Sequence, residues 1–238
     1  LTNISLINKF LKDLLKKKLI SNKTKTLEIA SNDASLLKIM YNLFKNLCIG
    51  VEPAKNLQKE YTKDISVITN FFSFRLSNSI KKKYDQFDLV IARNVIAHVK
   101  DPLDVFKGVY NLLKSKGIFI VEVPYLLYFF KENQYDNVFH EHNGFHSVKS
   151  INDLCESNNL FLYNLSIISS QGGSIRCFIS KKYKNKSKLL LKYLEIEKRY
   201  KIFNFNTWNQ FSDLVYKHKD KMYKIIYELN KKGKSVSI

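Results

Sequence analysis

The sequence is short of cysteine, proline, glycine and arginine, and it has no long apolar run. Its three cysteines, Cys48, Cys155 and Cys177, lie far apart and form no CxxC pair, so neither a disulfide framework nor a cysteine-ligated zinc site is expected. The longest apolar run, at 117–130, is broken by Glu122 and Pro124, which argues against a membrane span. We also find no signal-peptide pattern, and we expect a cytoplasmic protein.

The shortage of arginine bears on the strong positive charge. The formal net charge is +19, yet only four of the 40 basic residues are arginine. Recognition of phosphates and base edges favours the planar fork of arginine, whereas scattered lysine is compatible with many functions. The composition therefore argues against a nucleic-acid-binding module. It indicates a solvated lysine surface with some attraction for anionic ligands such as nucleotides.

What the chain does contain is a regular alternation of strands and helices. With 45% hydrophobic residues, its 238 residues suffice for one packed domain with an appendage. An amphipathic helix is expected at 4–20. Strands are expected at 26–30, 48–53, 66–69, 87–93 and 118–124, and helices at 35–44 and 102–117, the last of these ending on a glycine. Such an order predicts an α/β fold with a parallel sheet covered by helices on both faces.

The second half of the chain is expected to be less regular. A helix at 147–159 and strands at 160–168 and 174–180 precede long lysine-rich helices between 186 and 232. Residues 232–238 resemble the opening strand of a further unit. We therefore expect an N-terminal helix at 1–22, a main domain at 23–182 and a helical extension at 183–238.

The crevice of a parallel sheet lies beyond the carboxyl ends of its strands, so the loops after residues 30, 53, 70 and 93 should surround one site. The first loop, in "LEIASNDASLL" (27–37), can turn backbone N–H groups toward a carboxylate or phosphate. Glu52 closes the second strand 24 residues after Glu28, where a carboxylate can bind both hydroxyls of a ribose. This geometry suits a dinucleotide site or a methyltransferase, and an acidic residue there is also common in simple turns and caps.

Six motifs in order carry a more specific resemblance: "LEIASNDASLL", "GVEPAKNL", "DLVIARNVIAHVKDP", "EVPYL", "YDNVFHEHNGFHS" and "QGGSIR". In sequence and spacing they resemble the sugar C-methyltransferase family. Its members are S-adenosylmethionine-dependent enzymes with a Rossmann-like class I methyltransferase sheet. They methylate a ring carbon of nucleotide-linked deoxy-ketosugars. The resemblance covers residues 20–180 closely and the helical tail loosely.

The resemblance implies a role for each loop of the crevice. S-adenosylmethionine is the implied cofactor, and its contacts would come from Ala30, Ser31, Asn32, Asp33, Glu52, Asn70, Phe71 and Asn94. The family usually has glycine where this chain has Ala30 and Ala34. An alanine methyl there would narrow the pocket or require a negative φ, and the sequence leaves open whether this weakens cofactor binding.

Methylation of carbon also requires a base, because a carbon beside a ketone is only weakly acidic. By resemblance His142 is the general base, with Glu141 and His98 in the substrate pocket. The implied substrate contacts are Phe139, Tyr125, Gly172, Gly173 and Arg176. The alternating His140, His142 and His146 share a face if their segment is extended, but with no fourth ligand in the sequence we expect no metal.

Two parts of the family pattern are missing from the sequence: the cysteine-rich zinc domain that usually comes first, and most of the C-terminal domain. A partner chain that supplies the missing domains would restore both. One alternative is therefore an inactive truncated subunit that binds ligand without turnover. Another keeps the cofactor but methylates oxygen or nitrogen of a sugar or other small metabolite, with His142 deprotonating a hydroxyl.

Overall fold

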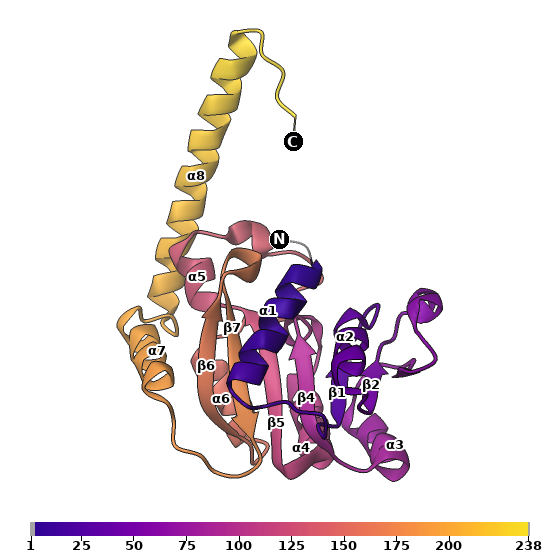
Figure 1. Cartoon of the computed structure of the whole chain (residues 1–238). Helices are drawn as coiled ribbons and strands as arrows, with labels where there is room; N and C mark the ends of the chain where they lie inside the picture. The colour runs from indigo at the N-terminus through magenta and orange to yellow at the C-terminus, as the bar shows by residue number, and fades with distance from the viewer. Residues whose placement is uncertain (1–2, 238) are drawn as a thin grey trace.

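A seven-stranded sheet forms the centre of the molecule (Figure 1). The structure, a computed structural model, describes residues 3–237, with all side chains except those of residues 3, 58, 59 and 171. The strand order is β3-β2-β1-β4-β5-β7-β6, and β7 runs antiparallel to both of its neighbours. The strands are β1 Thr26–Ile29, β2 Cys48–Val51, β3 Ser66–Ile68, β4 Phe87–Arg93, β5 Leu113–Pro124, β6 Phe161–Ile168 and β7 Ser174–Ser180. The predicted α/β architecture is confirmed.

Eight α-helices surround or extend from this sheet. They are α1 Asn3–Lys16, α2 Ser35–Phe44, α3 Phe74–Tyr84, α4 Pro102–Leu112, α5 Leu126–Lys131, α6 Val148–Glu156, α7 Lys188–Arg199 and α8 Phe205–Lys231, all counted within residues 3–237. None of the helices in this part of the chain combines the length and apolarity needed to cross a bilayer.

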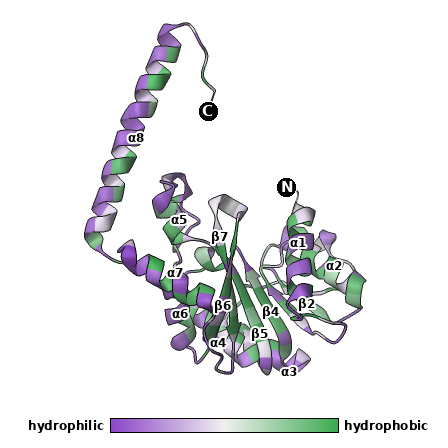
Figure 2. Ribbon diagram, turned by 60° about the vertical axis from the view of Figure 1, so that its left-hand side comes forward, coloured by the Kyte–Doolittle hydropathy of each residue, from purple (hydrophilic) through white to green (hydrophobic). Residues whose placement is uncertain are grey.

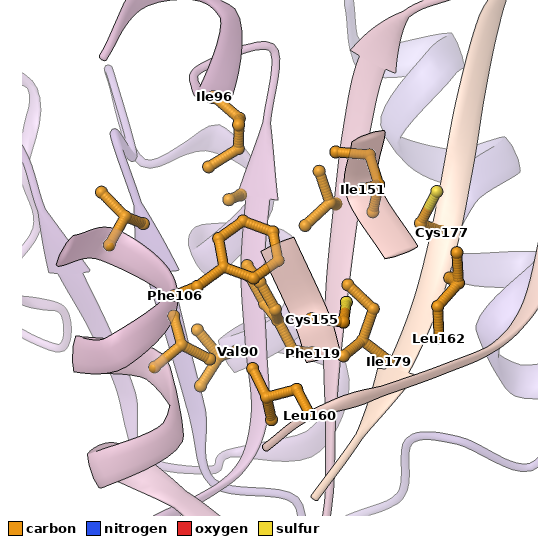
Figure 3. Packing of buried hydrophobic residues seen from close by; sticks show 14 of the residues in the cluster. Val90, Ile96, Phe106, Phe119, Ile151, Cys155, Leu160, Leu162, Cys177 and Ile179 are labelled. Carbon is orange, nitrogen blue, oxygen red and sulfur yellow. The ribbon is translucent and has the colours of Figure 1, made fainter. Parts of the chain in front are cut away.

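Alternate residues of the strands supply two separate cores, one on each face of the sheet. Leu89 and Ile91 of β4 pack with Phe10 of α1 and Leu37 of α2. Val90, between them, faces the opposite core, which holds α3, α4, α6 and α7. There Phe106 and Phe119 meet edge to face with ring centroids 5.3 Å apart (Figure 3). The strands are therefore buried on both faces, as expected for a doubly covered sheet.

The predicted helix at 102–117 was too long. Helix α4 ends at Leu112, and the chain passes directly into β5 at Leu113. Gly117 lies inside this strand, where an added Cβ would come within 2.9 Å of the Phe87 carbonyl oxygen. Glycine is therefore required at this position because the backbones pack closely, and it does not mark the end of a helix.

Two further differences concern elements with weak sequence signals. Helix α3 was not predicted, because only Leu76, Ile80 and Tyr84 give it an apolar row within a polar segment. The strand predicted at 232–238 was wrong over its described part, since residues 234–237 form no strand and residue 238 lies outside the described residues. That segment follows α8, far from both edges of the sheet (Figure 1), so no strand is available to pair with it.

Helix α8 projects from the body of the molecule (Figures 1 and 2). Its first turns are anchored on α5, where Phe211 stacks on Phe129 with ring centroids 5.2 Å apart. By helical spacing, Met222, Ile225, Ile226 and Leu229 fall on the same side of the helix as Phe211 and form an apolar stripe. Hydrophobic segments recur along α8 in Figure 2. No residue of α8 after Phe211 is fully buried, so described residues leave this stripe uncovered.

Candidate active site

A cleft of about 1090 Å³ opens at the carboxyl ends of β1, β2 and β4. Its position is the one expected for ligands of a parallel sheet. Among the residues predicted for the site, the cleft is lined by Ala30, Ser31, Asn32, Asp33, Glu52, Phe71, Asn94, His98 and Glu141. Asn70 is exposed beside Phe71 and does not line the cleft.

The loop after β1 carries an unusual backbone. Ala30, Asn32 and Ala34 have φ values of 54°, 50° and 57°, in the left-handed region that favours glycine. The expectation that alanine would require a negative φ was therefore wrong. The loop keeps the left-handed corners and accepts the strain, about 1–2 kcal/mol for each non-glycine residue.

Glu52 holds this loop in place. Its Oε2 accepts the backbone N–H of Asn32 at 2.9 Å, and its Oε1 accepts that of Ala54 at the same distance. Tyr61 adds a second tie by donating its hydroxyl to the Asn32 carbonyl oxygen at 2.8 Å. Because each carboxylate oxygen has two lone pairs, Glu52 can still accept hydrogen bonds from a bound ligand.

Two charged residues on the floor of the cleft were not predicted as site residues. Glu28 lies within β1, and burial raises its pKa to about 7 even though Arg93 Nη2 donates to its Oε1 at 3.3 Å. Glu28 Oε2 and Arg93 Nε are buried without a hydrogen-bond partner among the described residues, as is Ser31 Oγ. The sequence did indicate that Glu28 is unusual, because a glutamate rarely occurs inside a short apolar strand such as "TLEIA".

The histidine loop brings two imidazole rings together at the rim. His98 and His142 have ring centroids 4.8 Å apart. Nδ1 of His98 is 3.0 Å from the Glu141 carbonyl oxygen, and Nδ1 of His142 is 2.8 Å from the Asn137 carbonyl oxygen. A carbonyl oxygen can only accept, so both Nδ1 atoms carry the proton. In the neutral rings both Nε2 atoms are then free to act as bases.

These two histidines differ in their access to the cleft. His98 and Glu141 are among the residues that line it, whereas His142 is half-buried and is not among them. The His142 ring packs on Phe139 with centroids 4.1 Å apart. Phe139 is therefore a packing partner of His142 and is not among the residues that line the cleft.

The other two histidines of the loop, His140 and His146, differ in their exposure to solvent. His140 is almost fully exposed, with its Nε2 4.0 Å from a carboxylate oxygen of Glu141. His146 is buried, and this burial lowers the pKa of its ring below the ordinary value. Within residues 3–237 no three His, Cys, Asp or Glu side chains are grouped as a metal ion would require.

Tyr125 does not occupy the substrate position predicted for it. Its side chain is 1% exposed, and its hydroxyl donates to Glu197 Oε1 of α7 at 2.9 Å. The ring is therefore part of the core. The sequence placed it correctly at the end of β5 but gave no indication that α7 covers that position.

The "QGG" turn is also used for packing. A Cβ on Gly172 would meet the Gln134 side chain at 2.7 Å, and one on Gly173 would meet the Tyr128 ring at 2.4 Å. The Gly173 N–H donates to the Ser170 carbonyl oxygen. These glycines thus allow close approach of α5 and of Gln134 after it, and the Gly173 amide is bonded within the turn.

Arg176 lies outside the large cleft. Its Nε donates to Glu122 Oε1, and its Nη1 donates to Asp13 Oδ2 at 3.0 Å. Two carboxylates therefore pair with the guanidinium that was predicted to contact the substrate. It lines a second, smaller cavity beside the cleft.

Two protein-family models match parts of the chain. Residues 3–164 match the family described as "Methyltransferase domain". The chain belongs to this family. Residues 169–238 match a second family, described as "C-methyltransferase C-terminal domain".

One curated relative of the methyltransferase is informative at the sequence level. The chain is 34% identical over 152 residues to the C-methyltransferase NovU of Streptomyces niveus. The match covers 63% of this chain and 36% of that protein. The chain therefore spans about a third of the length of the relative.

Solved structures share the fold of the methyltransferase at low sequence identity. One is magnesium protoporphyrin IX methyltransferase from Synechocystis PCC 6803 with bound SAH, with a TM-score of 0.57, 12% identity, and coverage of 75% of this chain and 83% of that one. Another is a SAM-dependent methyltransferase from Anabaena variabilis, with a TM-score of 0.56, 11% identity, and coverage of 73% and 84%. These likenesses establish a Rossmann-like class I methyltransferase fold.

Proposed function

We propose that the chain is an S-adenosylmethionine-dependent methyltransferase that methylates a ring carbon of a nucleotide-linked ketosugar. The membership of the methyltransferase family and the likeness to a C-methyltransferase support the reaction class. The lysine-rich surface supports an anionic substrate, since a net charge of +19 attracts phosphates. The sugar itself rests on the family resemblance of the motifs.

S-adenosylmethionine is the cofactor, and the cleft residues fit it. Glu52 retains lone pairs for ribose hydroxyls, and the buried Ser31 Oγ has no partner among described residues. Buried polar atoms without partners are rare in folded proteins and are a mark of ligand sites. When bound, the cofactor supplies an electrophilic methyl group on a positively charged sulfur.

The observation that carries the mechanism is the free Nε2 of His98 on the cleft wall. Nδ1–H donates to the Glu141 carbonyl oxygen, which fixes both the tautomer and the orientation of the ring. Asn143 fixes the backbone of the same residue by donating to the His98 carbonyl oxygen at 2.6 Å. His98 removes a proton from the carbon beside the ketone, and that carbon then takes up the methyl group.

His142 acts through His98 in this proposal. The sequence favoured His142 as the base, but its ring is packed against Phe139 and does not line the cleft. At 4.8 Å between ring centroids it supports the His98 ring from behind. We therefore assign proton removal to His98 and positioning to His142, with Glu141 beside them.

The test is hydrogen exchange without a methyl donor. The protein is incubated in heavy water with a nucleotide-linked ketosugar and S-adenosylhomocysteine, and deuterium at the carbon beside the ketone is followed by NMR. Exchange is expected for the wild type and should fall about 10²–10⁴-fold in His98→Asn, the usual contribution of a positioned base. His140→Asn, an exposed histidine of the same loop, should exchange like the wild type.

The outcome separates this mechanism from its rivals. Methyl transfer without any such exchange would indicate methylation of oxygen or nitrogen, where the base acts on a hydroxyl or amine. Full exchange in His98→Asn with loss in His142→Asn would return the role of base to His142. No binding of S-adenosylhomocysteine by the folded chain would favour a subunit without turnover.

A further inference from the structure

A second cavity of about 280 Å³ lies directly beside the cleft. Along the sheet edge the cleft covers the ends of β2, β1 and β4, and the smaller cavity continues over β4, β5, β7 and β6. Helix α1 forms its outer wall through Leu6, Lys9, Phe10 and Asp13. The smaller cavity therefore lies next to the cofactor cleft along the same edge of the sheet.

Buried charged groups line this cavity. Glu122 is 6% exposed and Arg176 is 7% exposed, so each is more than nine-tenths buried. Among the described residues, only Oε1 of Glu122 is engaged, by Arg176 Nε, and Arg176 Nη2 has no hydrogen-bond partner. Each of these groups can bond a ligand, because a carboxylate accepts through both oxygens and a guanidinium donates through five N–H groups.

An aromatic ring completes the wall. The Phe10 ring contacts two guanidinium groups, with Arg176 Cζ 4.5 Å and Arg93 Cζ 5.4 Å from its centroid. Both contacts are within the range of cation–π attraction. Together with the Asp13–Arg176 ion pair they fix α1 over the cavity, so the polar wall is held in a defined geometry.

The two cavities meet at Asn94, and the residues Arg93 and Asn94 line both. Asn94 has a φ of 53° and donates its backbone N–H to the Glu122 carbonyl oxygen at 2.8 Å. This corner turns the chain at the end of β4 so that one residue faces both spaces. A ligand in the smaller cavity would therefore end where the cofactor site begins.

We propose that this smaller cavity binds the sugar ring of the methyl acceptor, an inference that rests on the proposed function. Its volume corresponds to about nine water molecules at roughly 30 Å³ each, which suits one monosaccharide ring and not a nucleotide as well. Glu122 and Asp13 accept hydrogen bonds from ring hydroxyls, and Arg176 donates to ring oxygens, while the buried Phe10 ring supports the Arg176 guanidinium. The ring carbon next to Asn94 then faces the cofactor and His98.

The test fills the cavity without removing a charge. Ser166 of β6 lines the cavity, and Ser166→Val places two methyl groups in it with a residue that suits strands. Asn164→Val is the matched control, since Asn164 lies on the same strand outside the cavity and bonds only the Leu165 N–H among described residues. Thermal unfolding of both variants reports whether the fold is kept.

Calorimetric titrations use three probes: S-adenosylhomocysteine, thymidine diphosphate, and thymidine diphosphate-linked 4-keto-6-deoxyglucose. For Ser166→Val we expect about tenfold or more weaker binding of the sugar nucleotide, equivalent to about 1.4 kcal/mol. The affinities for thymidine diphosphate and S-adenosylhomocysteine should be unchanged. Asn164→Val should bind all three probes like the wild type.

The other outcomes overturn the inference. If Ser166→Val binds the sugar nucleotide like the wild type, the ring lies elsewhere and the proposed function stands. An equal loss for thymidine diphosphate would mean that the cavity does not select the sugar ring. If the wild type binds S-adenosylhomocysteine but not the sugar nucleotide, the nucleotide-sugar function fails together with the subsite.

Discussion

Glu28 shows how one buried residue couples the site to the stability of the fold. It lies in the middle of β1, and its carboxylate contacts Arg93 on the neighbouring β4. Burial raises its pKa from 4.5 to about 7, so near neutral pH the folded protein holds a proton that the unfolded chain has lost.

We therefore expect stability to fall as the pH rises from about 4.5 to about 7. In this window the folded state binds more protons than the unfolded state, so the free energy of unfolding decreases with pH. Glu28→Gln removes the titration and should raise the free energy of unfolding by about 2–4 kcal/mol at pH 8, since one pKa unit corresponds to about 1.4 kcal/mol. At pH 4.5 the variant and the wild type should be nearly equal.

Urea denaturation at both pH values checks this prediction. Glu195→Gln, an exposed glutamate on α7, is the control and should leave the pH dependence unchanged. A Glu28→Gln variant that is less stable than the wild type at pH 8 would show that the ion pair with Arg93 outweighs the burial of the charge.

Single residues of the site were predicted unevenly from the sequence. Glu52 and the loop of residues 30–33 follow strands with clear apolar patterns, and all of them line the cleft. Tyr125 and Arg176 were placed correctly, after β5 and on β7, but the bonds of their side chains to α7 and α1 were not predicted. Which helix covers a strand end depends on tertiary packing, and short-range spacing does not encode it.

Helix α6 illustrates a stabilising contact between elements. Its first turn donates two backbone N–H groups, from Val148 at 2.6 Å and Lys149 at 3.0 Å, to the carboxylate of Glu197 on α7. Glu197 is fully buried and also accepts the Tyr125 hydroxyl. A negative charge at a helix N-terminus is favourable, so this carboxylate joins α7, α6 and the end of β5.

We expect Glu197→Gln to lower the free energy of unfolding by about 1–3 kcal/mol, because an amide leaves buried donors unsatisfied. The change should appear as a lower urea midpoint at unchanged slope. Glu195→Gln, two residues earlier on the same helix, should have no such effect because its side chain is exposed. A change in S-adenosylhomocysteine affinity without a change in stability would contradict this structural role.

Elements were predicted best where many apolar residues repeat with one period. Strands β1, β2 and β4 and helix α2 match the prediction within two residues, because buried strands and an amphipathic helix leave strong patterns. Helix α3 has an apolar row of only three residues, and the start of β5 reads as a continuation of α4. In both places packing against the sheet determines the element more than local preference does.

At the scale of the whole molecule, α8 should be the first part of the chain to be cleaved by trypsin. Its lysines beyond His218 lie on a helix that has no fully buried residue after Phe211. An unpacked helix of this length opens easily in water. Mass spectrometry of a short digest should show cleavage at Lys219–Lys232 before cleavage at Lys81–Lys83 of the docked α3.

The trimmed protein should keep the melting temperature of the intact chain, because the removed residues contribute little to either core. Protection of α8 that disappears on dilution would instead show that its apolar stripe is covered by a second copy. Cleavage in α3 at the same rate would mean that the lysines of the body are equally accessible.

Arg93 and Arg176, which both contact Phe10, are arginines in a chain whose other basic residues are mostly lysine. Of the 40 basic residues 36 are lysine, and no described lysine is fully buried. Acylation of every lysine would change the formal net charge from +19 to 19 − 36 = −17. Guanidinium groups do not react under such conditions, so Arg93 and Arg176 would keep their charges, whereas Lys100 and Lys9, which line the two cavities, would lose theirs. Acylation would therefore remove the long-range attraction of an anionic substrate and leave the guanidinium groups of both cavities in place.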